Sequence, residues 1–211
     1  SASGRLTKDG IRIYEPVDYA GMAEAGRIAA TILDEIAPHI FVGQTTAELD
    51  GIITEMVTAH GAKSATIGYK GYQHASCISV NHVVCHGIPA DKRIKEGDIL
   101  NIDVTVILDG WYGDTSRMYA VGKLPRKSER LIQVTHDALF KGISAVMPGN
   151  SFGDIGHAIQ TYVENHRMSV VKDFCGHGLG QVFHAPPNVL HYGQPGTGPV
   201  LEEGMFFTIE P

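Results

Sequence analysis

The sequence predicts an α+β fold in which helices cover one face of an antiparallel sheet. Four segments carry apolar residues at helical spacing, whereas residues 100–116 alternate apolar and polar residues around a short turn, as a strand pair does. Two of the helical segments begin with the same capping motif at an offset of 106 residues (151 minus 45, 154 minus 48). An internal repeat of this kind predicts a pseudo-symmetric domain with two similar halves.

The first two helices have clear start and stop signals. Apolar residues recur at helical spacing from Asp18 to Ile36, and Pro38 then stops the helix. Thr45 and Glu48 form a capping box ahead of the second helix, because a Thr side chain and a Glu three residues later cap each other's backbone N–H groups. Gly61 is expected to end this second helix.

The second half of the chain shows the same kind of signal. Residues 128–146 read as a long helix that stops before Pro148. Ser151 and Asp154 form another capping box ahead of a fourth helix. We therefore expect two helices and antiparallel strands in each half.

Length and composition favour a single domain. The chain has 211 residues, of which 43% are hydrophobic, enough for one sizeable core or two small halves. We expect one domain over 1–211, with halves at about 1–124 and 125–211, and a monomer. The formal net charge of -6 argues against a DNA partner or an anionic membrane held by bulk positive charge, and a local basic patch is the alternative that it leaves open.

The cysteines favour a reducing compartment. Cys77, Cys85 and Cys175 are odd in number and include no C-x-x-C pair, which argues against a disulfide framework and a structural zinc site. No apolar run approaches the length of roughly 18 residues that a membrane helix needs. We therefore expect a soluble, cytoplasmic protein.

The strand pair carries two carboxylates on its polar face. Asp109-Gly110 is a strong signal for a two-residue turn, which would place Thr105 opposite Asp114 and Asp103 opposite Ser116. Asp103 and Asp114 would then be diagonal neighbours, with side chains roughly 5 to 8 Å apart, near enough to repel each other or to hold a cation. A solvated polar face is the alternative interpretation.

Three further residues in the second half have side chains suited to metals. His177 lies between two glycines, which suggests close backbone approach and an imidazole held at a fixed position in a loop. His184 follows, ahead of a double proline, and Glu210 ends a strongly apolar segment that reads as a strand. An unpaired carboxylate would be costly there. Carboxylate oxygens with an imidazole nitrogen suit Mn, Fe, Co or Zn.

Six motifs follow one another over nearly the whole chain: "SVNHVVCHGIP", "GDILNIDVTV", "GWYGDTSRMY", "FCGHGLG", "FHAPPNVLHY" and "GMFFTIEP". In their residues and their order they resemble the motifs of the type I methionine aminopeptidases. The resemblance implies the pita-bread fold, in which two pseudo-symmetric halves share a curved antiparallel sheet covered by helices. It also implies metal-dependent removal of the initiator methionine from nascent proteins.

The resemblance assigns roles to particular residues. It implies two divalent metal ions (Co, Mn, Fe or Zn) held by Asp103, Asp114, His177 and Glu210, and attack on the first peptide bond by a hydroxide that bridges the metals. Glu210 would also accept a proton from the attacking water. His184 would donate to the carbonyl oxygen as it becomes an oxyanion, and His86 would contact the scissile nitrogen.

The resemblance also implies an apolar pocket for the methionine side chain. The matching residues are Tyr69, Tyr72, Cys77 and Phe183, with His86 and His184 at the reacting bond. Aromatic side chains suit a polarizable thioether. The expected partner is the amino-terminal methionine of nascent polypeptides, with transient ribosome contact as a further possibility.

Two other functions fit the same resemblance. Proline-specific aminopeptidases share the fold and the metal ligands, although they usually carry a large domain ahead of the catalytic one. Some pita-bread proteins have lost their metal ligands and serve as non-catalytic peptide-binding modules. This chain has Asp103, Asp114, His177, His184 and Glu210, which argues against the binding module.

The end of the sequence leads to one further expectation. Family members continue beyond the "TIEP" motif and supply a second bridging Glu on a later strand, whereas this sequence stops at Pro211. We therefore expect a longer functional chain from which the C-terminal metal-binding strand is missing here.

Overall fold

The computed structural model describes residues 4–211 and divides into two compact units. The first unit contains residues 20–129, and the second contains residues 4–19 together with 130–211. The division into halves at about 1–124 and 125–211 stays a prediction. The structure places the amino-terminal segment, residues 4–19, with the second unit. Each unit has a hydrophobic core of its own.

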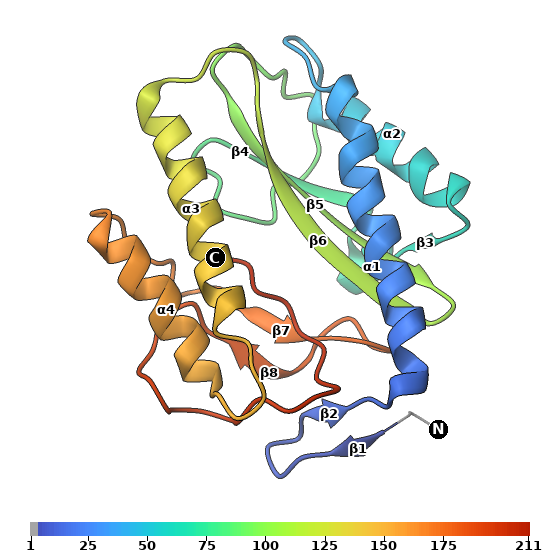
Figure 1. Ribbon diagram of the computed structural model, residues 1–211. Helices are drawn as coiled ribbons and strands as arrows, with labels where there is room; N and C mark the ends of the chain where they lie inside the picture. Colours follow the sequence, from blue (N-terminus) through green and yellow to red (C-terminus); the bar gives the residue numbers. More distant parts are fainter. Residues whose placement is uncertain (1–3) are drawn as a thin grey trace. The chain divides into compact units, whose positions relative to one another are not determined.

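The first unit packs two helices against a four-stranded antiparallel sheet (Figure 1). The helices are α1 (Pro16–Ile36, beginning in the second unit) and α2 (Thr46–Ala59), with short 3-10 turns η1 (Ala37–His39) and η2 (Tyr69–Gly71). Strand β5 (Ile99–Leu108) pairs with β6 (Trp111–Ala120) along one edge. Its other edge pairs with β3 (Lys63–Ser64) and β4 (Ser76–Val80).

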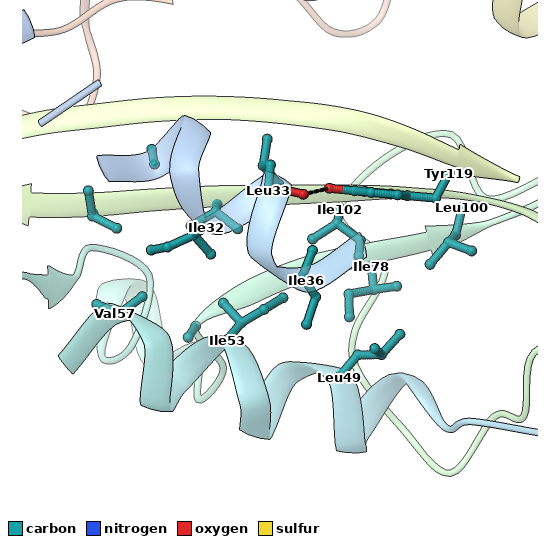
Figure 2. Packing of buried hydrophobic residues seen from close by; sticks show 14 of the residues in the cluster. Ile32, Leu33, Ile36, Leu49, Ile53, Val57, Ile78, Leu100, Ile102 and Tyr119 are labelled. Carbon is teal, nitrogen blue, oxygen red and sulfur yellow. Dashed lines mark hydrogen bonds between the residues drawn. The ribbon is translucent and has the colours of Figure 1, made fainter. Parts of the chain in front are cut away.

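The core of the first unit uses the apolar face of β5 that the sequence predicted. Leu100, Ile102, Val104 and Val106 are fully buried and pack against α1 and α2. Figure 2 shows this packing, including the hydrogen bond at 2.5 Å that the Tyr119 hydroxyl donates to the carbonyl of Leu33 on α1. The opposite face of β5 carries Asn101, Asp103 and Thr105.

The second unit builds its core from two helices and short strands. These are α3 (Arg126–Ser144, whose first residues belong to the first unit), α4 (Phe152–Asn165), β7 (Gly176–Gly178) and β8 (Ala185–Val189), with the small hairpin of β1 (Arg5–Leu6) and β2 (Arg12–Ile13). Ile155 and Ile159 of α4 are fully buried in this core.

The predicted repeat is present in the local structure of both units. Helices α2 and α4 each have 14 residues, and both begin with the predicted capping box. The first residue of each of these helices also donates a backbone hydrogen bond to a distant carbonyl group: Thr46 N donates to Lys92 O, and Phe152 N donates to Pro199 O. Isolated bridges accompany these bonds at Thr45–Arg93 and Ser151–Val200. The expected α+β fold is confirmed.

Helix ends differ slightly from the expected ones for local reasons. Helix α1 begins at Pro16 because proline suits the first turn of a helix, where its missing N–H needs no partner. Helix α3 begins at Arg126, directly after Pro125, and ends at Ser144. None of the helices within residues 4–211 combines the length and apolar character required to span a lipid bilayer.

Candidate metal centre and substrate pocket

The hairpin of β5 and β6 presents its two acids as predicted. Thr105 faces Asp114 and Asp103 faces Ser116, so both carboxylates lie on one face as diagonal neighbours. Asp109 and Gly110 have φ values of 49° and 85°, the left-handed conformation that a two-residue turn of type I′ requires. The turn therefore fixes the register that brings Asp103 and Asp114 together.

Gly113 explains why Asp114 is held at its position. A Cβ atom on Gly113 would lie 2.1 Å from the carbonyl oxygen of Ala25, so the backbone of β6 rests directly on helix α1 at this point. Because side chains alternate along a strand, Asp114 then points to the opposite face, away from the helix. Both acids are partly buried.

His177 has the hydrogen bond that metal-binding histidines commonly make. Its Nδ1 lies 2.9 Å from the carbonyl oxygen of Gly178, to which it donates. Nε2, the ring nitrogen that would face a metal in the predicted site, lies 3.7 Å from Oε1 of Glu210. The two side chains that the sequence proposed as ligands in this unit thus face each other.

The glycines beside His177 act through close approach. A Cβ atom on Gly176 would lie 2.3 Å from Thr208 O, and one on Gly178 would lie 2.2 Å from Pro186 O. This part of the expectation is confirmed. The predicted loop position was wrong, since His177 is the middle residue of strand β7. Backbone lies close on both sides of this segment, which leaves room only for glycine beside His177. The same neighbouring backbone pairs with the segment and makes it a strand.

The segment before Glu210 is less regular than expected. Residues 205–209 form one isolated bridge, between Phe207 and Gly178, so the predicted strand was wrong as a continuous ladder. The Glu210 side chain is 43% exposed and accepts a hydrogen bond from the Thr208 hydroxyl at 2.6 Å. The expected burial cost therefore does not arise.

His191 is a neighbour of Glu210 that sequence reasoning missed. It is 3% exposed, and its Nε2 accepts a hydrogen bond of 3.0 Å from the backbone N–H of Glu210. Burial lowers the pKa of His191 to about 4, which keeps the ring neutral and able to accept. The available signal was a histidine inside the mostly apolar stretch "NVLHY".

Two further histidines lie on loops. In the second unit, the ring centroid of His184 lies 4.3 Å from that of His177, and His184 stacks on Phe183 at 4.1 Å. In the first unit, His86 is exposed and has a φ of 55°. The next residue, Gly87, lies against β4, since its Cβ would be 2.1 Å from Ile78 O, and this contact fixes the loop that carries His86.

The candidate pocket residues of the first unit lie around the start of β4. The Cys77 thiol donates to the Tyr72 hydroxyl at 3.5 Å, and that hydroxyl donates to Ser76 O at 2.7 Å. Cys77 is the residue directly opposite Asp103 in the sheet. Burial raises the pKa of the Cys77 thiol, so this side chain stays neutral. Tyr69 lies in η2 and is 37% exposed.

Each unit holds two of the four metal ligands that the sequence predicted. Asp103 and Asp114 belong to the first unit, and His177 and Glu210 to the second. Within residues 4–211, no three His, Cys, Asp or Glu side chains are grouped closely enough to hold one ion. Carboxylate oxygens and an imidazole whose Nδ1 is engaged by a carbonyl match the ligands that Mn, Fe, Co and Zn accept.

Comparison with known proteins decides the family. The model of metallopeptidase family M24 matches residues 20–211. The chain belongs to this family. It is 56% identical over 201 residues to a methionine aminopeptidase of Rickettsia prowazekii, covering 95% of this chain and 78% of that protein. It is 50% identical over 203 residues to the methionine aminopeptidase of Escherichia coli K12, covering 95% and 77%.

Solved structures of the family agree. The crystal structure of the Rickettsia prowazekii enzyme matches with a TM-score of 0.93 and 55% identity, over 94% of this chain and 80% of that one. The methionine aminopeptidase of Thermotoga maritima matches with a TM-score of 0.90 and 39% identity, over 92% and 79%. Prolidase from Pyrococcus furiosus, at 22% identity and a TM-score of 0.78, shares the fold alone. Membership of the M24 family implies dependence on a divalent metal.

Proposed function

We propose that this chain is a metal-dependent aminopeptidase that removes the initiator methionine from newly made proteins. The observation that carries the proposal is 50 to 56% identity to methionine aminopeptidases over 95% of the chain, together with the donor atoms described above. The substrate is the amino-terminal Met of a nascent polypeptide, cleaved when the second residue is small. We place the reaction in the cytoplasm, with the protein acting as a monomer.

Asp103, Asp114, His177 and Glu210 are the proposed ligands of two divalent ions. The diagonal carboxylates of the hairpin and the 3.7 Å approach of His177 Nε2 to Glu210 Oε1 support this set. When bound, such ions supply a hydroxide near neutral pH and polarise the carbonyl of the scissile bond. Because availability usually decides among Co, Mn, Fe and Zn at such sites, all four remain candidates.

The proton steps belong to three side chains. Glu210 Oε1 already accepts a hydrogen bond from Thr208, and we assign it the proton of the attacking water. His184, exposed and stacked on Phe183, donates to the carbonyl oxygen as negative charge develops there. His86, held by the contact of Gly87 with β4, contacts the scissile nitrogen and helps to protonate the leaving amine.

The substrate side chain is bound by Tyr69, Tyr72, Cys77 and Phe183. Aromatic rings and a neutral thiol form an apolar, polarizable surface that suits the thioether of methionine. The position of Cys77 opposite Asp103 supports a pocket directly beside the metal ligands. Proline-specific cleavage has weaker support, since the prolidase neighbour is 22% identical and shares the fold alone.

Hydrolysis of two peptides tests the proposal. The protein is freed of metal, reloaded with Mn or Co, and offered Met-Ala-Ser and an Ala-Pro peptide of the same length. Release of methionine from the first, dependent on added metal, is the expected result. Cleavage of only the Ala-Pro peptide would make the chain a proline-specific enzyme, and cleavage of neither under any metal would favour the non-catalytic binding module.

A further inference from the structure

Asp50 is a buried carboxylate with an unusual number of partners. It lies on α2 and is 7% exposed. Its Oδ1 accepts from the Ser76 hydroxyl at 2.7 Å, from Ser76 N at 3.0 Å and from Ala75 N at 3.1 Å. Its Oδ2 lies 3.2 Å from Nδ1 of His74. One side chain thus holds three successive residues at the entry to β4.

Helix formation does not explain this acid. The capping box of α2 is made by Thr45 and Glu48, and both of its hydrogen bonds are complete without Asp50. A buried carboxylate is costly unless its acceptor sites are satisfied, and an apolar residue here would pack at no such cost. The contacts of Asp50 therefore point to the segment that it holds, residues 74–76.

That segment joins two parts of the proposed substrate site. Ser76 accepts a hydrogen bond from the Tyr72 hydroxyl through its carbonyl, and the same hydroxyl accepts from the Cys77 thiol. The ring of His74 packs edge-on against Tyr72, with centroids 5.5 Å apart. Cys77 follows Ser76 in the strand and faces Asp103 across the sheet. Asp50 is thus linked to both pocket side chains through its own hydrogen-bond partners.

We propose that Asp50 is a positioning residue that sets the depth of the methionine pocket. It fixes Tyr72 and Cys77 relative to Asp103, and hence the place of the substrate side chain relative to the scissile bond. The inference rests on the proposed function, which assigns Tyr72 and Cys77 to the pocket. An apolar pocket distinguishes side chains only by shape, so small displacements of its wall change selectivity.

The test compares Asp50→Asn and Ser76→Ala with the intact protein loaded with Mn. Asp50→Asn replaces one acceptor oxygen with a donor, and Ser76→Ala removes only the 2.7 Å bond. Asp98→Asn is the matched control, because Asp98 in the same unit also accepts from a backbone N–H (Lys95) and a side chain (Asn81). The measurements are kcat and KM for Met-Ala-Ser and Leu-Ala-Ser, the affinity for L-methionine by calorimetry, and bound metal.

Asp50→Asn is expected to raise KM for Met-Ala-Ser about tenfold, within the range that misplacement of a binding group produces. The preference for Met over Leu and the affinity for L-methionine fall together, while kcat and bound metal remain close to the values of the intact protein. Ser76→Ala changes the same quantities in the same direction by less, and Asp98→Asn leaves them unchanged. A purely structural role would lower the folded fraction without altering the preference.

Unchanged KM and preference in Asp50→Asn would overturn the inference, as would loss of metal or kcat with KM unaltered. If Asp50→Asn does not fold, Ser76→Ala decides, and wild-type behaviour of that variant counts against the inference. Failure of the proposed function looks different, because the intact protein itself would then release no methionine from Met-Ala-Ser with any metal.

Discussion

His177 and Glu210 face each other, and Nε2 of the histidine lies 3.7 Å from Oε1 of the glutamate. The other ring nitrogen of His177, Nδ1, donates a hydrogen bond of 2.9 Å to Gly178 O. The ring orientation is therefore set by a backbone carbonyl, as is common for histidines that bind metals through the other nitrogen. His191 adds a second constraint by accepting the N–H of Glu210. The fold thus orients both proposed ligands of this unit through backbone groups.

This geometry predicts a difference between two variants of His177. In His177→Gln the amide oxygen reaches about as far as Nε2, whereas in His177→Asn it reaches only as far as Nδ1. We expect His177→Asn to weaken metal binding by roughly 10- to 100-fold more than His177→Gln does. Calorimetric titration of the metal-free proteins with Mn measures this, and a greater loss in the Gln variant would place ligation at Nδ1.

Asp103→Ala is predicted to lose metal and nearly all activity while remaining folded. Asp103 lies on the polar face of β5, outside the core formed by Ile102 and Val104, so its removal leaves the packing of the sheet intact. Ser116→Ala is the control, since Ser116 faces Asp103 in the sheet and is not a proposed ligand. Elemental analysis and circular dichroism give the two readouts. Normal metal content in Asp103→Ala would remove this residue from the ligand set.

His184→Ala is predicted to keep its metal and to lose turnover by about 10²-fold or more, the scale for one transition-state hydrogen-bond donor. The residue is exposed and stacks on Phe183, so stability should change little. The measurements are kcat for Met-Ala-Ser and bound metal. Parallel losses of metal and kcat would instead make His184 a ligand.

Two glycine variants test how tightly β7 is packed. Gly178→Ala would bring a methyl group to 2.2 Å from Pro186 O, and because this neighbour is backbone, we expect a loss of about 1–3 kcal/mol in unfolding free energy. Gly51→Ala, in the interior of α2 with open space around it, should gain about 1 kcal/mol from helix propensity. Urea denaturation compares both, and equal stability of the two variants would mean that β7 can shift.

The elements that the sequence predicted well are those with local signals. The register of β5 and β6 follows from Asp109-Gly110 and the alternation of residues beside it, and the structure confirms each facing pair that was predicted. The capping boxes at Thr45 and Ser151 are equally local, because all their hydrogen bonds lie within four residues. Such features need no knowledge of distant parts of the chain.

What the sequence did not predict depends on distant contacts. Strand β7 has three residues, too few for a pattern, and exists because it pairs with β8 on one side and Phe207 on the other. The buried acceptor role of His191 and the four contacts of Asp50 likewise join residues 19 to 26 positions apart. Side-chain type alone does not reveal such partners.

Tyr119 gives a prediction for alkaline pH. The residue is 9% exposed, and its hydroxyl donates to Leu33 O on α1. Burial raises the pKa of Tyr119 from 10.0 to about 12, so the folded chain holds the phenolic proton more tightly than the unfolded chain. Unfolding then releases a proton between these pH values. The stability contributed by this group is fully present below pH 10 and is lost as the pH rises from 10 to 12.

The rise in the pKa of Tyr119 from 10.0 to about 12 corresponds to about 3 kcal/mol of unfolding free energy. The wild-type protein should lose this stability as the pH rises above 10, whereas Tyr119→Phe should not. The variant should be about 1 kcal/mol less stable at pH 7, where the hydrogen bond to Leu33 is missing. Burial also raises the pKa of Tyr72, so part of the alkaline slope remains in the variant. The measurement is therefore the difference between the urea-unfolding curves of the two proteins from pH 8 to 12. A constant difference over that range would show that Tyr119 ionises equally in both states.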